Sequence, residues 1–136
     1  MKLTKNFDLS EFTAINYLEL DKTIFNNIQS LAHLVQSARD HLGCKIKITS
    51  GLRSKVKNDS IVGASKSSQH LNGQACDIVS LNPGKVTNLD ILNYFKDNIK
   101  KLGIDQLINE KPHYGVPSWI HVSIAKNPRG MYFTIY

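Results

Sequence analysis

The longest run of apolar positions at helical spacing lies at about residues 22–42. Asp21 precedes this run and Gly43 follows it, and these residue types favour a helix N-cap and a left-handed helix end. The pattern predicts one long amphipathic helix, because steps of three and four residues place eight apolar side chains on one face: Ile24, Phe25, Ile28, Leu31, Leu34, Val35, Ala38 and Leu42.

Two shorter helices are also predicted. One spans about residues 89–102, with Asn88 as its cap and apolar residues at helical steps. The other lies near 9–15, where Asp8 and Glu11 have the spacing of a capping box.

Strands are predicted where polar and apolar residues alternate, or where apolar runs lie between turn residues. The segments are 45–49, 74–80, 105–110, 119–125 and 131–136. Residues 127–130 supply a tight connection between the last two strands. Residues 54–69 are mostly polar and lack a period, so we expect a long surface loop there. The order predicts an α+β fold in which helices flank a mainly antiparallel sheet.

The composition is that of one compact globular domain. The chain has 136 residues, of which 41% are hydrophobic, and we expect residues 1–136 to form a single monomeric domain. No apolar run approaches the ~20 residues that cross a bilayer, so no membrane insertion is expected. The N-terminus lacks the apolar stretch of a secretory signal, which predicts synthesis in a cytoplasm. Cys44 and Cys76 are then expected to be buried free thiols.

The charge balance points to an anionic partner. The formal net charge is +6 and the sequence pI is about 9.4. Nucleic acid and anionic cell-wall polymer both fit this charge. The basic residues are scattered, however, and lack the clusters with interleaved aromatics that are typical of a nucleic-acid groove. We therefore favour a cell-wall partner and do not expect nucleic-acid binding.

The candidate chemistry lies in the pattern Ser68-x-His70-x-x-Gly73-x-Ala75-x-Asp77, followed far downstream by Trp119-Ile120-His121. Two histidines and one aspartate are ligands of an open zinc site, in which the fourth position is left to water. The spacing between His70 and Asp77 suits a loop that turns at Gly73 and enters a strand. The three residues therefore predict one zinc ion per chain and metal-assisted hydrolysis.

These residues resemble a family of zinc peptidases that contains D-Ala-D-Ala carboxypeptidases and L-alanyl-D-glutamate peptidases. The family shares its fold with the hedgehog signalling domain. Its motifs are matched in order over about residues 48–124, namely Ser-x-x-Arg at 50–53, Ser-x-His-x6-Asp at 68–77 and Trp-x-His at 119–121. Residues 6–12 resemble the start of small phage-encoded members.

The resemblance also implies a general base for the hydrolysis. In many relatives an acidic residue stands three positions before the last zinc histidine, but here that position is Ser118. Small phage-type members have instead the strand Asp-Gln-Leu-Ile-x-Glu, which this chain matches at 105–110. Glu110 is therefore predicted to be the base, if this strand pairs with the strand of His121. His113 is the alternative, because a histidine titrates near neutral pH.

Two further residues are assigned by the resemblance or by their position. Arg53 would bind a substrate carboxylate or the developing oxyanion, since a guanidinium is permanently charged and binds carboxylates in a fork. Ser68 would support the loop of His70 or contact the substrate.

The family implies a peptidase that acts on the stem peptides of peptidoglycan. The sequence leaves open whether it is a carboxypeptidase or an endopeptidase. A phage endolysin would reconcile a cell-wall substrate with the missing signal, because a separate protein could release it into the host periplasm. A second hypothesis is a zinc-stabilised binding module without catalysis, which the serine at position 118 would support.

Overall fold

The computed structural model describes residues 1–62, 64 and 68–136. Its helices are α1 (Lys22–Leu42), α2 (Lys55–Ser60) and α3 (Asn88–Asp97). Short 3-10 turns lie at Leu9–Glu11, Tyr17–Glu19 and Gln69–Asn72. The strands are β1 (Ile46–Ser50), β2 (Ala75–Ser80), β3 (Ile104–Glu110), β4 (Trp119–Ile124) and β5 (Met131–Ile135). None of the helices among these residues is long and apolar enough to cross a membrane.

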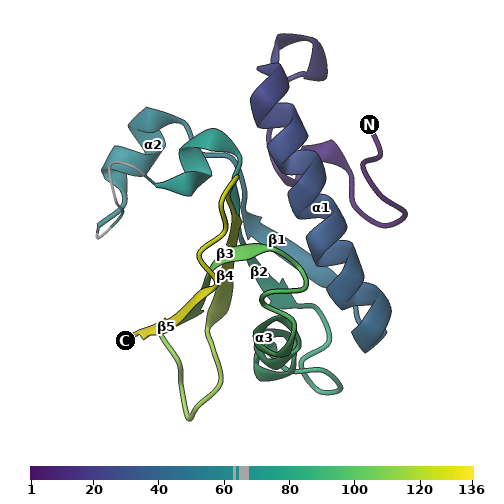
Figure 1. Ribbon diagram of the computed structural model, residues 1–136, viewed down its shortest axis with the longest axis vertical. Helices are drawn as coiled ribbons and strands as arrows, with labels where there is room; N and C mark the ends of the chain where they lie inside the picture. The colour runs from purple at the N-terminus through teal and green to yellow at the C-terminus, as the bar shows by residue number, and fades with distance from the viewer. Residues whose placement is uncertain (63, 65–67) are drawn as a thin grey trace.

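One five-stranded sheet organises the molecule, in the order β1-β2-β4-β3-β5. The first three neighbouring pairs are antiparallel, whereas β5 runs parallel to β3 at the edge. Helices α1 and α3 lie on one side of the sheet and α2 on the other (Figure 1). The predicted α+β fold, with a mainly antiparallel sheet flanked by helices, is confirmed.

The core lies between the sheet and the two longer helices. Cys76 and Ile78 of β2 and Val122 of β4 are fully buried in it, together with apolar side chains of α1 and α3. Because successive side chains of a strand point to opposite faces, the residues between them are directed away from this core. Both cysteines are buried and free. Burial raises the pKa of the Cys76 thiol, so this side chain remains protonated.

The long helix begins and ends as predicted. The Asp21 carboxylate accepts a hydrogen bond from the backbone N–H of Ile24 at 3.0 Å, and Gly43 adopts the left-handed conformation with φ 61°. The predicted helix at 9–15 is shorter, a 3-10 turn over Leu9–Glu11, although the capping box is present.

The prediction for the second helix was wrong at both ends. Helix α3 begins at Asn88 rather than after it, because Thr87 forms the capping box with Asp90. The Asn88 side chain instead accepts a hydrogen bond from the backbone N–H of Ser80 and donates one to the carbonyl of Pro117. The helix ends at Asp97, where the Asn98 side chain bonds the carbonyl of Tyr94 and competes with the helical pattern.

The predicted loop at 54–69 contains a helix that the pattern did not indicate. Helix α2 has no apolar periodicity and is six residues long, and its start is stabilised by the Ser54 side chain, which accepts a hydrogen bond from the N–H of Lys57. Residues 63 and 65–67 of this predicted loop lie outside the described residues.

The connection at 125–130 does not join neighbouring strands. After β4 the chain passes β3 and enters β5 on the far side of it. The backbone N–H of Gly130 donates to the carbonyl of Ile104 at the start of β3, which fixes this crossing.

Gly51 stands where two parts of the chain approach closely. A Cβ atom at this position would lie 2.4 Å from the carbonyl oxygen of Phe12, and Phe12 is itself 2% exposed. We predict that Gly51→Ala lowers the free energy of unfolding by about 1–3 kcal/mol, because backbone must move to admit the methyl group. Urea denaturation would measure the change.

Gly84→Ala is the matched control, since the nearest atom to a Cβ there is 4.0 Å away. Equal stability of the parent and the Gly51→Ala protein would contradict the prediction.

Candidate metal and active site

Two of the predicted ligands face each other across β2 and β4. Asp77 pairs with His121 in the antiparallel register, and both side chains point away from the face that packs on the helices. Nδ1 of His121 lies 3.1 Å from Oδ1 of Asp77. The register of the two strands therefore brings together residues that are 44 positions apart.

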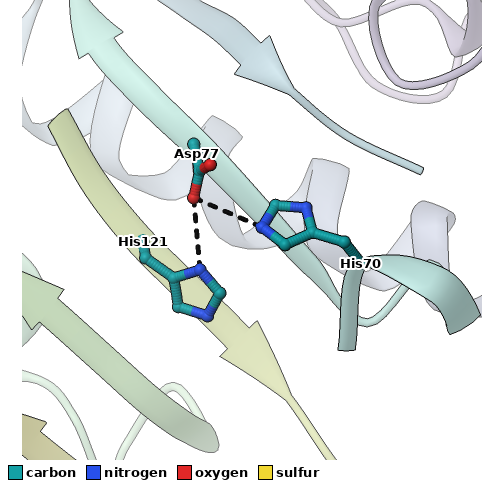
Figure 2. Close-up of side chains that lie close together, drawn as sticks. All are labelled: His70, Asp77 and His121. Carbon is teal, nitrogen blue, oxygen red and sulfur yellow. Dashed lines mark hydrogen bonds and ion pairs between the residues drawn. The ribbon is translucent and has the colours of Figure 1, made fainter. Parts of the chain in front are cut away.

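The third predicted ligand, His70, comes from the 3-10 turn Gln69–Asn72. The Ser68 hydroxyl oxygen accepts a hydrogen bond from the His70 backbone N–H and caps this turn. Gly73 ends the turn with φ 70°, a conformation that glycine adopts readily. Nε2 of His70 lies 3.4 Å from Oδ1 of Asp77. Figure 2 marks this contact and that of His121 with dashed lines to the same carboxylate oxygen.

The tautomer of His70 follows from its second contact. Its Nδ1 lies 2.8 Å from the carbonyl oxygen of Gly51, which can only accept a hydrogen bond, so Nδ1 carries a proton. In the neutral ring Nε2 then has a free lone pair directed toward Asp77 and His121. A backbone carbonyl that orients a histidine in this way is common in metal sites.

The donor set of His70, Asp77 and His121 fits a metal ion. One ligand atom from each residue can be chosen so that all three lie within 4.8 Å of one another, and all three residues are buried. Nε2 of His121 is buried without a hydrogen-bond partner among the described residues. Two imidazole nitrogens and a carboxylate oxygen that converge in this manner are typical zinc ligands.

Asp77 is ionised at neutral pH. Burial alone would raise its pKa, but a hydrogen bond from His121 and the neighbouring imidazole of His70 lower the pKa of this carboxyl to about 2. A carboxylate anion beside two imidazoles provides the negative charge that a divalent cation requires.

Arg53 lies behind this carboxylate. Its Nη2 is 3.3 Å from Oδ2 of Asp77, and its Nε is 3.2 Å from the hydroxyl of Ser50. Its Nη1 donates to Asn58 of α2, and its backbone N–H donates to the carbonyl of His70. Arg53 therefore holds Oδ2 of Asp77 while both histidines contact Oδ1, and its predicted contact with substrate stays a prediction.

One cavity of about 730 Å³ contains most of the predicted site residues. Its lining includes Arg53, Ser68, His70, Asp77, Glu110 and His121. One part of its wall is apolar, formed by Ile61, Val62, Ala64, Ile108 and Ile135. The cavity can accommodate a short peptide segment beside the three candidate metal ligands.

Glu110 lies at the end of β3, where it pairs with Trp119 of β4. Ile108 pairs with His121, so Glu110 lies one strand step further along the same face. Partial burial raises the pKa of Glu110, and the negative charge of Asp77 raises it further. Such a carboxylate accepts a proton more readily than an ordinary one.

His113 is not brought to this site. It is exposed in the loop after β3, where its backbone bonds that of Val116 and its ring contacts Tyr114. It is not among the described residues that line the cavity.

A charged cluster beside the site was missed by the sequence analysis. Asp105 of β3 is 1% exposed and accepts hydrogen bonds from the backbone N–H, Nε and Nη2 of Arg129 at 2.7–2.9 Å. It also accepts a hydrogen bond from the side chain of Gln69, the residue before His70. The signal available in the sequence was an aspartate in a predicted strand beside apolar residues, because a carboxylate buried in a sheet requires partners.

This cluster predicts acid sensitivity. Hydrogen bonds from Arg129 hold the pKa of Asp105 at about 2, below its ordinary value of 3.8. A lowered folded-state pKa stabilises the fold above the unfolded-state pKa, and this stabilisation is lost as pH falls from about 4 to about 2. The Asp105→Asn protein should therefore be less stable at neutral pH and lose less stability over that window. Denaturant unfolding at a series of pH values tests this, and parallel profiles of the two proteins would refute it.

Comparison with known proteins supports the same assignment. A family model described as Peptidase M15 matches residues 5–123. The solved structure of the L-Ala D-Glu endopeptidase ChiX from Serratia marcescens superposes with a TM-score of 0.51 at 19% sequence identity. The alignment covers 82% of this chain and 96% of that one, so the two folds agree over most of their length. No curated protein sequence matches the chain.

Proposed function

The chain belongs to the Peptidase M15 family, and we propose that it is a zinc-dependent peptidase that hydrolyses stem peptides of peptidoglycan. The observation that carries this proposal is the convergence of His70, Asp77 and His121 in one cavity with Glu110. A separate acid or base in the same cavity is what hydrolysis requires in addition to metal ligands.

The residues of the cavity have different roles in the proposed hydrolysis. A zinc ion held by His70, Asp77 and His121 would polarise the peptide carbonyl and make water a stronger nucleophile at neutral pH. Glu110 accepts the proton of the attacking water at its carboxylate and delivers it to the nitrogen of the leaving amine. Its raised pKa favours the first of these transfers, because a carboxylate with a higher pKa is a stronger base.

Arg53 and Ser68 support this machinery. Arg53 keeps Asp77 in place through the ion pair at 3.3 Å, and Ser68 keeps the turn of His70 in place through its cap. Both residues line the cavity, so each can also contact a substrate. Arg53 would then orient a substrate carboxylate or stabilise the oxyanion.

The substrate class rests on charge and on the structural neighbour. A net charge of +6 favours binding to an anionic wall polymer. The neighbour is described as an L-Ala D-Glu endopeptidase, so this bond is the first to test. We also keep as proposals a monomeric single domain, a phage lytic role and action on the wall after release.

Mass spectrometry of muropeptides before and after incubation of purified sacculi with zinc-loaded protein tests the proposed activity. Loss of a terminal D-Ala identifies a carboxypeptidase, whereas fragments split within the stem identify an endopeptidase. Protein treated with a chelator is the control. Unchanged muropeptides would favour the alternative, a zinc-stabilised binding module without catalysis.

A further inference from the structure

Three cationic side chains among the described residues line the cavity, and two of them already have carboxylate partners. Arg53 pairs with Asp77 at 3.3 Å and Arg129 with Asp105 at 2.7 Å. Lys111 is the third, and none of the ion pairs between described residues includes it. Its ammonium group is therefore available to an anionic ligand.

The backbone of Lys111 is held in an unusual conformation. Its φ is 44°, in the left-handed region that side-chain-bearing residues rarely adopt. The N–H of Lys111 donates to the carbonyl of Ile135 at 2.6 Å, and the carbonyl of Lys111 accepts from the Ser118 hydroxyl at 2.6 Å. The Ser118 N–H also donates to the carbonyl of Glu110. Strain that is fixed by several contacts beside a site indicates a functional position.

Ser118 thus has a role at the position where many relatives carry an acid. Its N–H donates to the carbonyl of Glu110, and its hydroxyl donates to the next carbonyl, that of Lys111. The corner that they form turns the chain immediately after the candidate base.

The side chain of Lys111 is directed over a neighbour in the cavity wall. Its Nζ lies 5.9 Å from the ring centroid of Trp119, which also lines the cavity. This contact with the ring face favours one position of an otherwise flexible cation, and it leaves the N–H donors of the ammonium free.

We propose that Lys111 is a specificity-determining residue that binds a free carboxylate of the substrate beside the scissile bond. The inference rests on the proposed function and adds to it the chemical class of the preferred peptide, an anionic one. The carboxylate would lie near the scissile bond because Lys111 and the candidate base Glu110 line the same cavity. Arg53 is less suited to this role, since Asp77 already occupies its Nη2.

The probes are three forms of one synthetic stem peptide. The first has both its glutamate α-carboxylate and its C-terminal carboxylate free, and each of the others has one of these groups amidated. The kcat/KM of the parent should be about tenfold lower for the form in which the bound carboxylate is amidated. The identity of that form also shows which carboxylate Lys111 binds.

Lys111→Met should cleave all three peptides equally well, at about the rate of the parent on its disfavoured form. Lys111→Arg should restore part of the preference. Lys111→Gly removes the charge with a residue that suits the left-handed backbone, so it separates loss of charge from misfolding. Lys126→Met is the control for net charge, because Lys126 is exposed and is not among the cavity-lining residues.

Binding is measured separately from turnover. Calorimetry compares the zinc-loaded Glu110→Gln protein with the double variant Glu110→Gln/Lys111→Met. The double variant should bind the free-carboxylate peptide about tenfold more weakly. If the parent cleaves peptides but Lys111→Met keeps the preference or lowers all rates equally, the role of Lys111 is overturned and the peptidase function stands. If no peptide is cleaved while binding still depends on Lys111, the catalytic proposal fails and the role of Lys111 stands. Absence of both cleavage and binding overturns both.

Discussion

The His121→Ala protein is expected to lose both its zinc and its peptidase activity. His121 supplies one of three candidate ligands, and the remaining pair, His70 and Asp77, offers a divalent cation too few donors for a stable site. Removal of a group that merely orients a ligand typically costs about 10–100-fold in metal affinity, so loss of a ligand should cost more than ~100-fold. Metal analysis after dialysis against a zinc buffer measures the stoichiometry.

His33→Ala is the matched control, because His33 is an exposed histidine of α1 on the other side of the sheet. It should keep one zinc per chain and the parent rate. Full zinc occupancy in the His121→Ala protein would show that the ligand set is different from the one proposed.

The Glu110→Gln protein is expected to keep its zinc and to lose turnover by ~10²–10⁴-fold. Glutamine has nearly the same shape as glutamate but accepts no proton at neutral pH. Because Glu110 is not a proposed metal ligand, the fold and the metal content should be those of the parent. Muropeptide release and zinc analysis on the same sample measure both quantities.

His113→Ala serves as the comparison, since His113 was the alternative base and lies exposed in the loop after β3. It should cleave at the parent rate. If His113→Ala is inactive and Glu110→Gln is not, the two roles are exchanged. If both variants cleave normally, another group accepts the proton.

Much of the fold could be predicted because its signals are local. The sequence of the long helix α1 contains an apolar face, an aspartate that can cap its start and a glycine that can end it. The structure has the helix between these two residues, with its apolar face buried. Each of the five predicted strand segments also corresponds to a strand. The predicted ends of α3 were wrong because Thr87 rather than Asn88 caps the helix, and because the Asn98 side chain bonds the carbonyl of Tyr94. Asn88 is instead used in hydrogen bonds to Ser80 and Pro117, which the sequence around α3 does not show.

Part of the candidate site could also be predicted from the sequence. The motif spacing identified His70, Asp77 and His121, and the strand register then explains how they meet. The sequence could not show that Arg53 is already paired with Asp77, because that contact depends on how the segment after β1 packs against β2. The same holds for Lys111, whose proposed role rests on a backbone angle and on hydrogen bonds to Ile135 and Ser118.

The two faces of the sheet have a consequence for how this protein can change over generations. Along β2 and β4, Cys76 and Val122 belong to the hydrophobic core, while Asp77 and His121 belong to the cavity. Neighbouring residues of these strands are therefore expected to be constrained differently, one by packing in the core and the next by the properties of the cavity. A new substrate preference can be acquired at alternate positions, such as Gln106 and Ile108 of β3, with little loss of core packing. Directed evolution of this protein should accordingly randomise cavity-facing positions such as Gln106 and Ile108, and should leave fixed both the candidate site residues and the core residues between them.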